Sequence, residues 1–108
     1  MNSGLAIAPK TGSAIYCATK SAMDSFSRSL GYQLESTSVQ VRQVFLPLVD
    51  TGMTEGRGSN KLKADDVAEK IIKGAASDKA VIDIGKVRLL RIINYLAPSL
   101  ARSIMKRG

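Results

Sequence analysis

Tyr16 and Lys20, a phenol and an ammonium four positions apart, are the residues of this sequence best placed to do chemistry. Apolar residues recur at helical spacing around them, from Ser13 to Glu35, so both side chains should project from one face of a helix. A neighbouring positive charge favours the ionised form of an acid, and Lys20 would therefore help Tyr16 to release a proton. The pair predicts a tyrosine that exchanges a proton with a bound substrate.

A third candidate, Ser3, stands thirteen positions before Tyr16. The stretch from Pro9 to Ser13 between them has turn-forming residues and is long enough to bring a hydroxyl back over the start of the helix. Each residue also has a purely structural interpretation when it is taken singly. Ser3 would then be a loop hydroxyl, Tyr16 a packing residue at the helix start, and Lys20 a solvated charge.

The order Ser, then Tyr-x-x-x-Lys, resembles the catalytic set of the short-chain dehydrogenase/reductase family. Residues 16–22, Tyr-Cys-Ala-Thr-Lys-Ser-Ala, are typical of that family's active-site helix. The resemblance implies an NAD(P)-dependent oxidoreductase that interconverts a carbonyl and an alcohol by hydride transfer. In that scheme Tyr16 is the acid or base, Ser3 binds the same substrate oxygen, and Lys20 binds the ribose hydroxyls of the cofactor. Taken together and in this order, the three residues favour the catalytic interpretation.

Residues 46–53 resemble the Pro-Gly-x-Val-x-Thr segment of the same family, which contacts the nicotinamide. Val49 matches the residue whose backbone holds the carboxamide, and Thr51 the residue whose hydroxyl reaches the cofactor. The sequence departs from the pattern at Pro47, which has no N–H and a fixed φ where the family has glycine. The resemblance therefore implies contacts of NAD or NADP, at its nicotinamide end, with five residues: Tyr16, Lys20, Pro47, Val49 and Thr51.

The fold class expected from the resemblance is α/β, as the C-terminal part of a doubly wound Rossmann-like parallel sheet. Family members are roughly twice this length, and they open with a strand, a Gly-rich turn and a helix that hold the pyrophosphate. No unit of that kind precedes Ser3. We therefore expect residues 1–108 to form one partial domain whose N-terminal dinucleotide-binding half, with the family's catalytic Asn, is missing. The isolated chain is expected to be inactive.

Periodicity predicts the elements that position these residues. Val39 to Leu46 reads as a strand that becomes continuously apolar, as a strand buried on both faces does. The resemblance makes Glu55 to Lys63 a substrate lid, and implies that the helix carrying Tyr16 pairs with a second subunit. Gly31 within that helix would mark a close contact. The remaining elements expected are a strand exit at Met1–Ile7, a helix at Ala64–Ala76, a strand at Ala80–Ile84 and an amphipathic helix at Lys86–Lys106, interrupted at Pro98.

Composition argues against a metal site and a catalytic thiol. With no histidine and one cysteine among 108 residues, a metal site is not expected, and Cys17 is interpreted as a packing residue because a catalytic thiol would need a histidine partner. No signal peptide or membrane-spanning run is visible, so the cytoplasm is the expected location.

The net charge of +7 is concentrated in Lys86–Gly108, which holds six basic residues and no acidic one. On the expected helix, Val87, Leu90, Ile93, Leu96, Leu100 and Ile104 fall on one side, and the preferred interpretation is a cap on the fold with a solvated basic face. A competing function is a basic amphipathic module for an anionic membrane or, less favoured, nucleic acid. A third is a fragment that only pairs with a full-length homologue. This tail also resembles one subgroup of the family, bacterial oxidoreductases found among cell-envelope D-alanylation genes.

Overall fold

Three short parallel strands form the centre of the computed structural model, which describes residues 1–47, 49–50 and 62–107. The strands are β1 (Asn2–Ser3), β2 (Gln43–Leu46) and β5 (Val81–Asp83), and they lie in the order β1-β2-β5. Asn2 pairs with Phe45, and Phe45 pairs with Asp83 on its other side. A separate pair of parallel strands, β3 (Val49–Asp50) and β4 (Leu62–Lys63), was not expected from the sequence.

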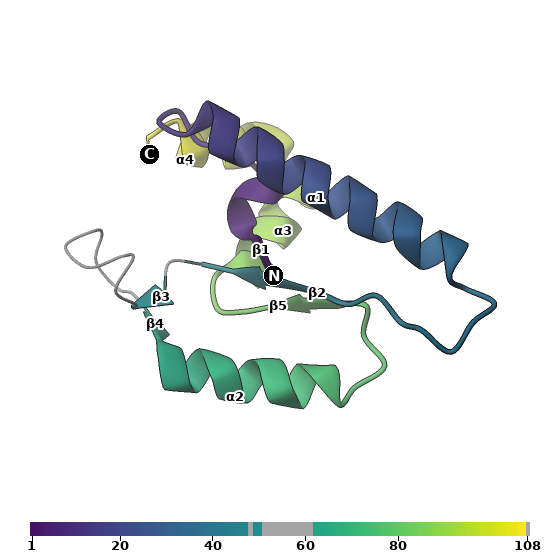
Figure 1. Ribbon diagram of the computed structural model, residues 1–108. Helices are drawn as coiled ribbons and strands as arrows, with labels where there is room; N and C mark the ends of the chain where they lie inside the picture. The colour runs from purple at the N-terminus through teal and green to yellow at the C-terminus, as the bar shows by residue number, and fades with distance from the viewer. Residues whose placement is uncertain (48, 51–61, 108) are drawn as a thin grey trace.

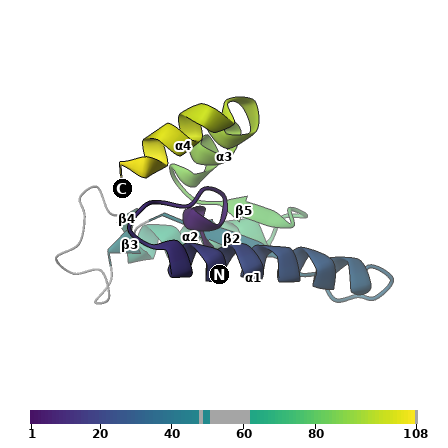
Figure 2. The ribbon, with the colours of Figure 1, turned by 90° about the horizontal axis from the view of Figure 1, so that it is seen from above.

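Helices cover both faces of the central sheet (Figure 1). α2 (Ala64–Ala75) lies against one face. α1 (Ala14–Gln33) lies on the other, beside the hairpin formed by α3 (Val87–Leu96) and α4 (Pro98–Lys106), as the view from above shows (Figure 2). The α/β class and the parallel sheet expected from the sequence are therefore confirmed.

The alternation of β2 side chains divides the core between these two faces. Val44 belongs to the cluster on the α2 side, whereas the fully buried Phe45 stacks under the guanidinium of Arg91 from α3, 4.6 Å from the ring centroid. The α2-side cluster is small and aliphatic, with Val44, Val67, Ile82 and Ile84 buried and Leu46, Leu62 and Ile71 packed against them. Cys17 is buried on α1 with a free thiol, as a packing residue should be.

Two element boundaries differ from the expectation for a local reason. The strand expected over 39–46 is confined to Gln43–Leu46, because pairing with β5 begins only at Gln43 opposite Val81. Arg42 is used instead to cap the end of α2, where its guanidinium donates to the carbonyls of Ala75, at 2.9 Å, and Ser77. The expected strand exit at 1–7 is mostly a 3₁₀ helix, η1 (Gly4–Ala6), which Ser3 caps.

The C-terminal expectation was partly wrong. Pro98 divides the region into two helices, occupying the first position of α4 where its missing N–H costs nothing. Val87 is buried as expected, but Leu96, Leu100 and Ile104 are exposed instead of core-facing.

Gly31 of α1 also lacks the expected close contact, because a Cβ there would meet nothing nearer than Val41 at 4.0 Å. None of the helices described is both long enough and apolar enough to cross a bilayer.

Candidate active site

The first turns of α1 hold Tyr16 and Lys20 side by side. The helix begins after Ser13, whose carbonyl accepts the first intrahelical bond from Cys17 N at 2.9 Å. Lys20 Nζ lies 5.5 Å from the centroid of the Tyr16 ring, within the range of a cation–π contact. Tyr16 is 49% exposed, so its ring is accessible to a ligand while its charge partner stays beside it. The four-residue spacing thus produces the juxtaposition that the sequence predicts.

Ser3 lies at the carboxyl end of β1, where the strand turns into η1. Its Oγ accepts a hydrogen bond from Leu5 N at 3.1 Å and so caps the short helix. A serine hydroxyl that accepts in this way still has its own proton to donate. The cap fixes the Oγ atom while leaving the donor function for another partner.

Asn2 connects this strand to α1, and sequence reasoning missed it. The side chain is 4% exposed, and its Nδ2 donates to the carbonyl oxygen of Lys20 at 3.2 Å. Its Oδ1 accepts from the backbone N–H of Ser3 at 2.8 Å. One amide therefore holds the backbone of Ser3 to the turn of α1 that carries Lys20. The available sequence signal was a polar residue in an otherwise buried strand, because such a group needs hydrogen-bond partners.

The contact continues into a chain of buried and half-buried polar groups. Asn2 Nδ2 also donates to Gln43 Oε1 at 3.1 Å, and Gln43 Nε2 donates to Asp24 Oδ1 at 2.8 Å. Asp24 is fixed in turn by an ion pair with Arg28 at 3.0 Å. β1, β2 and α1 are thus joined by polar side chains as well as by packing, which fixes the register between sheet and helix.

A second hydrogen bond supports the same arrangement from the loop side. Ser21 Oγ donates to the carbonyl of Ala6 in η1 at 3.1 Å. It comes from the residue after Lys20, so two successive residues of α1 contact the segment that contains Ser3. Ser3 is therefore carried by a strand and a turn that are both bonded to the helix bearing Tyr16 and Lys20.

The expected nicotinamide segment begins at the same edge of the sheet. Ser3 pairs with Leu46 in parallel register, so Ser3 and Pro47 both stand at carboxyl ends of neighbouring strands, where open α/β sheets bind ligands. The backbone of Val49 lies in β3 and pairs with Leu62. Thr51 and most of the expected lid, residues 55–61, lie outside the described residues. The structure therefore places Pro47 beside the candidate site and leaves the roles of Val49 and Thr51 as predictions.

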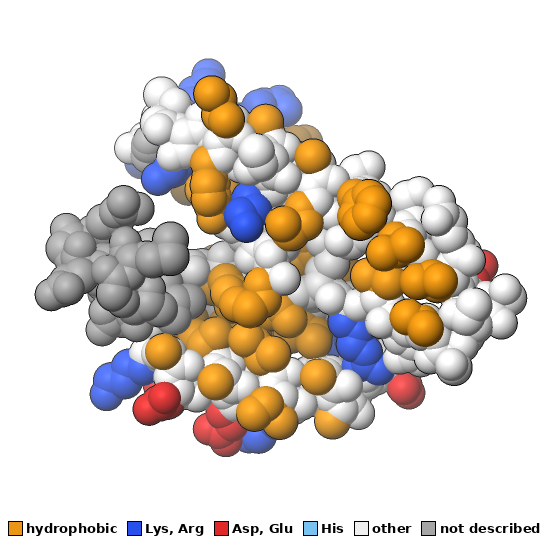
Figure 3. All heavy atoms as spheres, in the orientation of Figure 1, with side chains coloured by type: hydrophobic (Ala, Val, Ile, Leu, Met, Phe, Trp, Pro, Cys, Tyr) orange, Lys and Arg blue, Asp and Glu red, His pale blue; other side chains and the backbone are white. Residues whose placement is uncertain are grey.

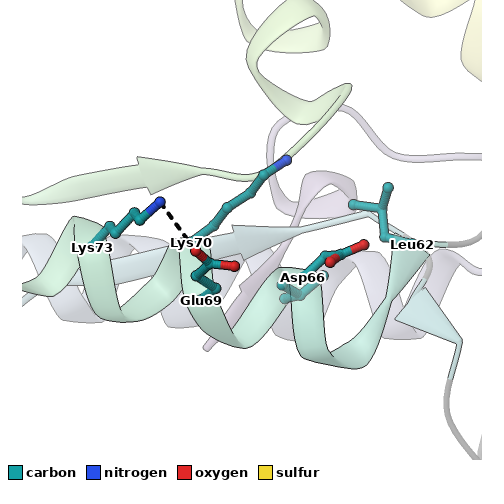
Figure 4. Close-up of a pocket in the computed structure, with 6 residues that line it drawn as sticks. Leu62, Asp66, Glu69, Lys70 and Lys73 are labelled. Carbon is teal, nitrogen blue, oxygen red and sulfur yellow. Dashed lines mark ion pairs between the residues drawn. The ribbon is translucent and has the colours of Figure 1, made fainter.

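Two surface hollows are lined by other residues. One, of about 230 Å³, follows α2 and is lined by Leu62, Asp66, Val67, Glu69, Lys70 and Lys73, with a Glu69–Lys73 ion pair of 3.2 Å along it (Figure 4). The other, of about 460 Å³, lies between the end of α1 and the amino ends of β2 and β5, near Gln43 and Val81. Neither is lined by Tyr16, Lys20 or Ser3.

Tyr16, Lys20 and Ser3 offer three complementary chemical groups. A half-exposed phenol can exchange a proton, an ammonium beside it can attract hydroxyl or anionic oxygens, and a hydroxyl can donate to a developing negative charge. Among the described residues of the site there is no imidazole or thiol positioned to take over these roles. The geometry suits proton transfer to or from a small oxygen-containing group.

Comparison with known proteins points to an oxidoreductase family. A family model described as short chain dehydrogenase matches residues 1–62. The uncharacterized oxidoreductase DltE of Bacillus subtilis is 34% identical over 97 residues, covering 84% of this chain and 38% of the relative. An uncharacterized oxidoreductase of Staphylococcus epidermidis is 36% identical over 67 residues, covering 59% of this chain and 29% of the relative.

The match to DltE agrees with the subgroup that residues 86–108 resemble. The chain spans well under half the length of either curated relative. No solved structure gave a significant match.

Proposed function

The chain belongs to the short-chain dehydrogenase family, and on that premise we propose that it forms the proton-transfer half of an NAD(P)-dependent oxidoreductase acting on a carbonyl or an alcohol. The observation that carries the proposal is that Lys20 lies beside the Tyr16 ring on α1. Asn2 connects the same part of α1 to the strand that ends at Ser3, through hydrogen bonds with the Lys20 carbonyl and the Ser3 N–H. The substrate class is a small carbonyl compound or the corresponding alcohol.

Each residue has a role that its position supports. Tyr16 donates its hydroxyl proton to the substrate carbonyl oxygen during reduction, and accepts the proton of the alcohol during oxidation. Ser3 donates a hydrogen bond to the same oxygen and stabilises the charge that develops there. Lys20 holds its ammonium beside the Tyr16 ring and donates to hydroxyl groups of the cofactor ribose.

The residues present fit the nicotinamide end of NAD or NADP. Lys20 presents an ammonium donor beside the exposed Tyr16 ring, and Pro47 stands at the strand end next to Ser3. When bound, the nicotinamide supplies or accepts the hydride. The protein groups then bind the ribose, orient the substrate oxygen and move one proton at the Tyr16 hydroxyl. We propose that Val49 and Thr51 complete the contacts of the nicotinamide ring.

We further propose that the 108 residues alone turn over negligible substrate. The family's pyrophosphate turn leads directly from a strand into the N-terminus of a helix. Gly52, Gly56 and Gly58 do have the spacing Gly-x-x-x-Gly-x-Gly, but α2 begins only at Ala64. We therefore assign no pyrophosphate site to these glycines, and the cofactor would be held by its nicotinamide end alone.

The experiment that tests the proposal is a chimera. The segment of the Bacillus relative that aligns with this chain is replaced by it, and the product is assayed with NADH and NADPH against a panel of small aldehydes and ketones, followed as loss of reduced-nicotinamide absorbance. We expect cofactor-dependent reduction by the chimera and none by the isolated chain. Clear turnover by the isolated chain would overturn the proposed inactivity, and a folded chimera that binds NADPH yet reduces nothing would contradict the assigned reaction.

The proton-transfer role is tested by two matched substitutions in the chimera. Tyr16→Phe removes the hydroxyl and should lower kcat by about 10²- to 10⁴-fold, as loss of a general acid does. Tyr32→Phe makes the same change at an exposed residue near the end of α1 and should leave kcat unchanged. Equal kcat values for the two variants would remove Tyr16 from the mechanism.

We also propose that α1 pairs with a second subunit, as the resemblance implies. Ile15 and Phe26 are exposed on α1, eleven residues apart and therefore on one face, with Ala22 between them. Burying this apolar stripe against a second copy would stabilise a dimer. Sizing of the chimera by light scattering tests this, and a Phe26→Glu variant should shift it to the monomer. A monomeric parent would contradict it.

A further inference from the structure

The α3–α4 hairpin exposes large apolar side chains among exposed basic ones. On α3, Leu89, Ile92 and Leu96 are exposed and lie three to four residues apart, so they share one side of the helix. Tyr95 is 85% exposed on the same side. On α4, Leu100 and Ile104 are exposed and four residues apart. We call these six residues the apolar strip of the hairpin.

Basic residues accompany the apolar strip on both helices. Arg88 is exposed on the same side of α3 as Ile92, and Arg102 and Lys106 are exposed on α4. Lys86 and Arg107 flank the hairpin at its two ends. The space-filling view shows blue side chains, and no red ones, around the end of the molecule where α4 lies, whereas red side chains lie along α2 (Figure 3).

Arg91, the sixth basic residue of this region, has a structural role instead. Arg91 donates to both carboxylate oxygens of Asp83, at 2.7 and 3.0 Å, and stacks on Phe45, so its charge is neutralised inside the fold. Across the described part of the chain, no carboxylate lies within ion-pair distance of the other five basic residues, namely Lys86, Arg88, Arg102, Lys106 and Arg107. All five are exposed at the surface.

We propose that the α3–α4 hairpin docks on an anionic lipid bilayer surface. A segment that lies in the membrane interface needs an apolar side, basic residues near the headgroups and aromatic side chains at their level. The apolar strip supplies the first, the five exposed cations the second, and Tyr95 the third. The proposal concerns membrane attachment and is independent of the oxidoreductase chemistry of the Tyr16 site.

Two other occupants fit the same surface less well. Nucleic acid is contacted mainly through phosphate and base groups, and five exposed aliphatic side chains would gain little from it. A second copy of the hairpin would bring five like charges face to face, which opposes self-association. An anionic bilayer complements both the charge and the aliphatic character of the surface.

The primary test is cosedimentation of the intact chain with vesicles of phosphatidylcholine alone and of phosphatidylcholine with about 30% phosphatidylglycerol, a composition that gives a negative surface potential. We expect binding to the anionic vesicles that weakens on raising the salt from roughly 0.1 M to 0.5 M, because screening shortens the reach of the charges. Binding to a DNA duplex without binding to vesicles, or equal binding to both vesicle types, would overturn the proposal.

A matched pair of variants separates the local surface from net charge. Arg102→Gln/Lys106→Gln removes two charges from α4 and should lower the partition coefficient on the order of tenfold or more. Lys70→Gln/Lys79→Gln removes two exposed charges elsewhere and should change it little. Circular dichroism checks that both keep the parent fold. An equal loss in the two variants would show that only net charge matters and would contradict the assigned surface.

Insertion depth gives a second, independent measurement. The sequence contains no tryptophan, so a Tyr95→Trp variant has a single indole reporter on the apolar strip. We expect its emission to shift to the blue on anionic vesicles and to be quenched by brominated lipid, since the strip would enter the acyl boundary. Emission that stays at the solvent-exposed wavelength while the protein cosediments would mean that the strip does not face the membrane.

Discussion

The side-chain amide of Asn2 donates a hydrogen bond to the backbone carbonyl of Lys20 at 3.2 Å. The same amide accepts from the N–H of Ser3, so a single buried residue sets the position of the strand end relative to the helix that carries Tyr16. The candidate site therefore depends on the register between β1 and α1, which a non-reacting side chain maintains.

Replacing Asn2 should weaken the fold measurably. Asn2→Ala removes the side-chain hydrogen bonds to the Lys20 carbonyl, to Gln43 Oε1 and from the Ser3 N–H, and we expect the free energy of unfolding to fall by about 1–3 kcal/mol. Urea denaturation followed by circular dichroism measures it. Gln33→Ala, an exposed change at the end of α1, should stay within about 0.5 kcal/mol of the parent. Equal effects of the two variants would contradict the bridging role of Asn2.

Two helical glycines should respond oppositely to the same substitution. A Cβ on Gly74 would lie 2.7 Å from Cδ1 and 2.9 Å from Cγ2 of Ile82, so Gly74→Ala must displace a buried side chain and should destabilise the protein by about 1–3 kcal/mol. Gly31→Ala meets no atom closer than 4.0 Å and should stabilise α1 by about 0.5–1 kcal/mol.

Thermal unfolding of the two glycine variants measures whether each substitution stabilises or destabilises the protein. The shifts in Tm should have opposite signs. A stabilising Gly74→Ala variant would mean that α2 does not pack on β5 as closely as the Ile82 contacts indicate.

The two phenylalanines form another matched pair. Phe45 is 0% exposed in the middle strand, and Phe45→Ala should cost about 3–5 kcal/mol, a large part of the stability of a small domain. Phe26 is 66% exposed on α1, and Phe26→Ala should cost well under about 1 kcal/mol in the monomer. Denaturation midpoints in guanidinium chloride compare them, and similar midpoints would contradict the assignment of Phe45 to the core.

The Arg91–Asp83 pair should act as a unit. Asp83 is largely buried and accepts two hydrogen bonds from Arg91, whose guanidinium also covers Phe45. In a double-mutant cycle with Arg91→Met and Asp83→Asn, we expect a coupling free energy of about 0.5–2 kcal/mol, limited by the partial exposure of Arg91. Strict additivity of the two single changes would show that the pair contributes no net stability.

Local sequence information accounts well for the chemistry-bearing elements. The four-residue spacing of Tyr16 and Lys20 required only that the segment be helical, and the apolar periodicity around it made that prediction safe. The apolar run ending at Leu46 similarly predicted a buried parallel strand, and Pro47 its end. These features follow from contacts between residues close in the chain, which a sequence displays directly.

Features that depend on distant partners were missed or misplaced. The strand expected from Val39 begins only at Gln43, because its length is set by the strand Val81–Asp83 that pairs with it. The bridging role of Asn2 needed the positions of Lys20 and Gln43, which are 18 and 41 residues away. Leu96, Leu100 and Ile104 were expected inside, yet the hairpin turn before Pro98 leaves them exposed.

By itself, the sequence determined the residue types that could move a proton, their place on one helix and the family to which the chain belongs. These three conclusions follow from the spacing of residues that are close together in the sequence. Only the tertiary structure decided how the Ser3 strand is held to that helix and which apolar residues of α3 and α4 meet solvent. Such outcomes depend on long-range packing and hydrogen bonding, whose partners are defined only when the whole chain has folded.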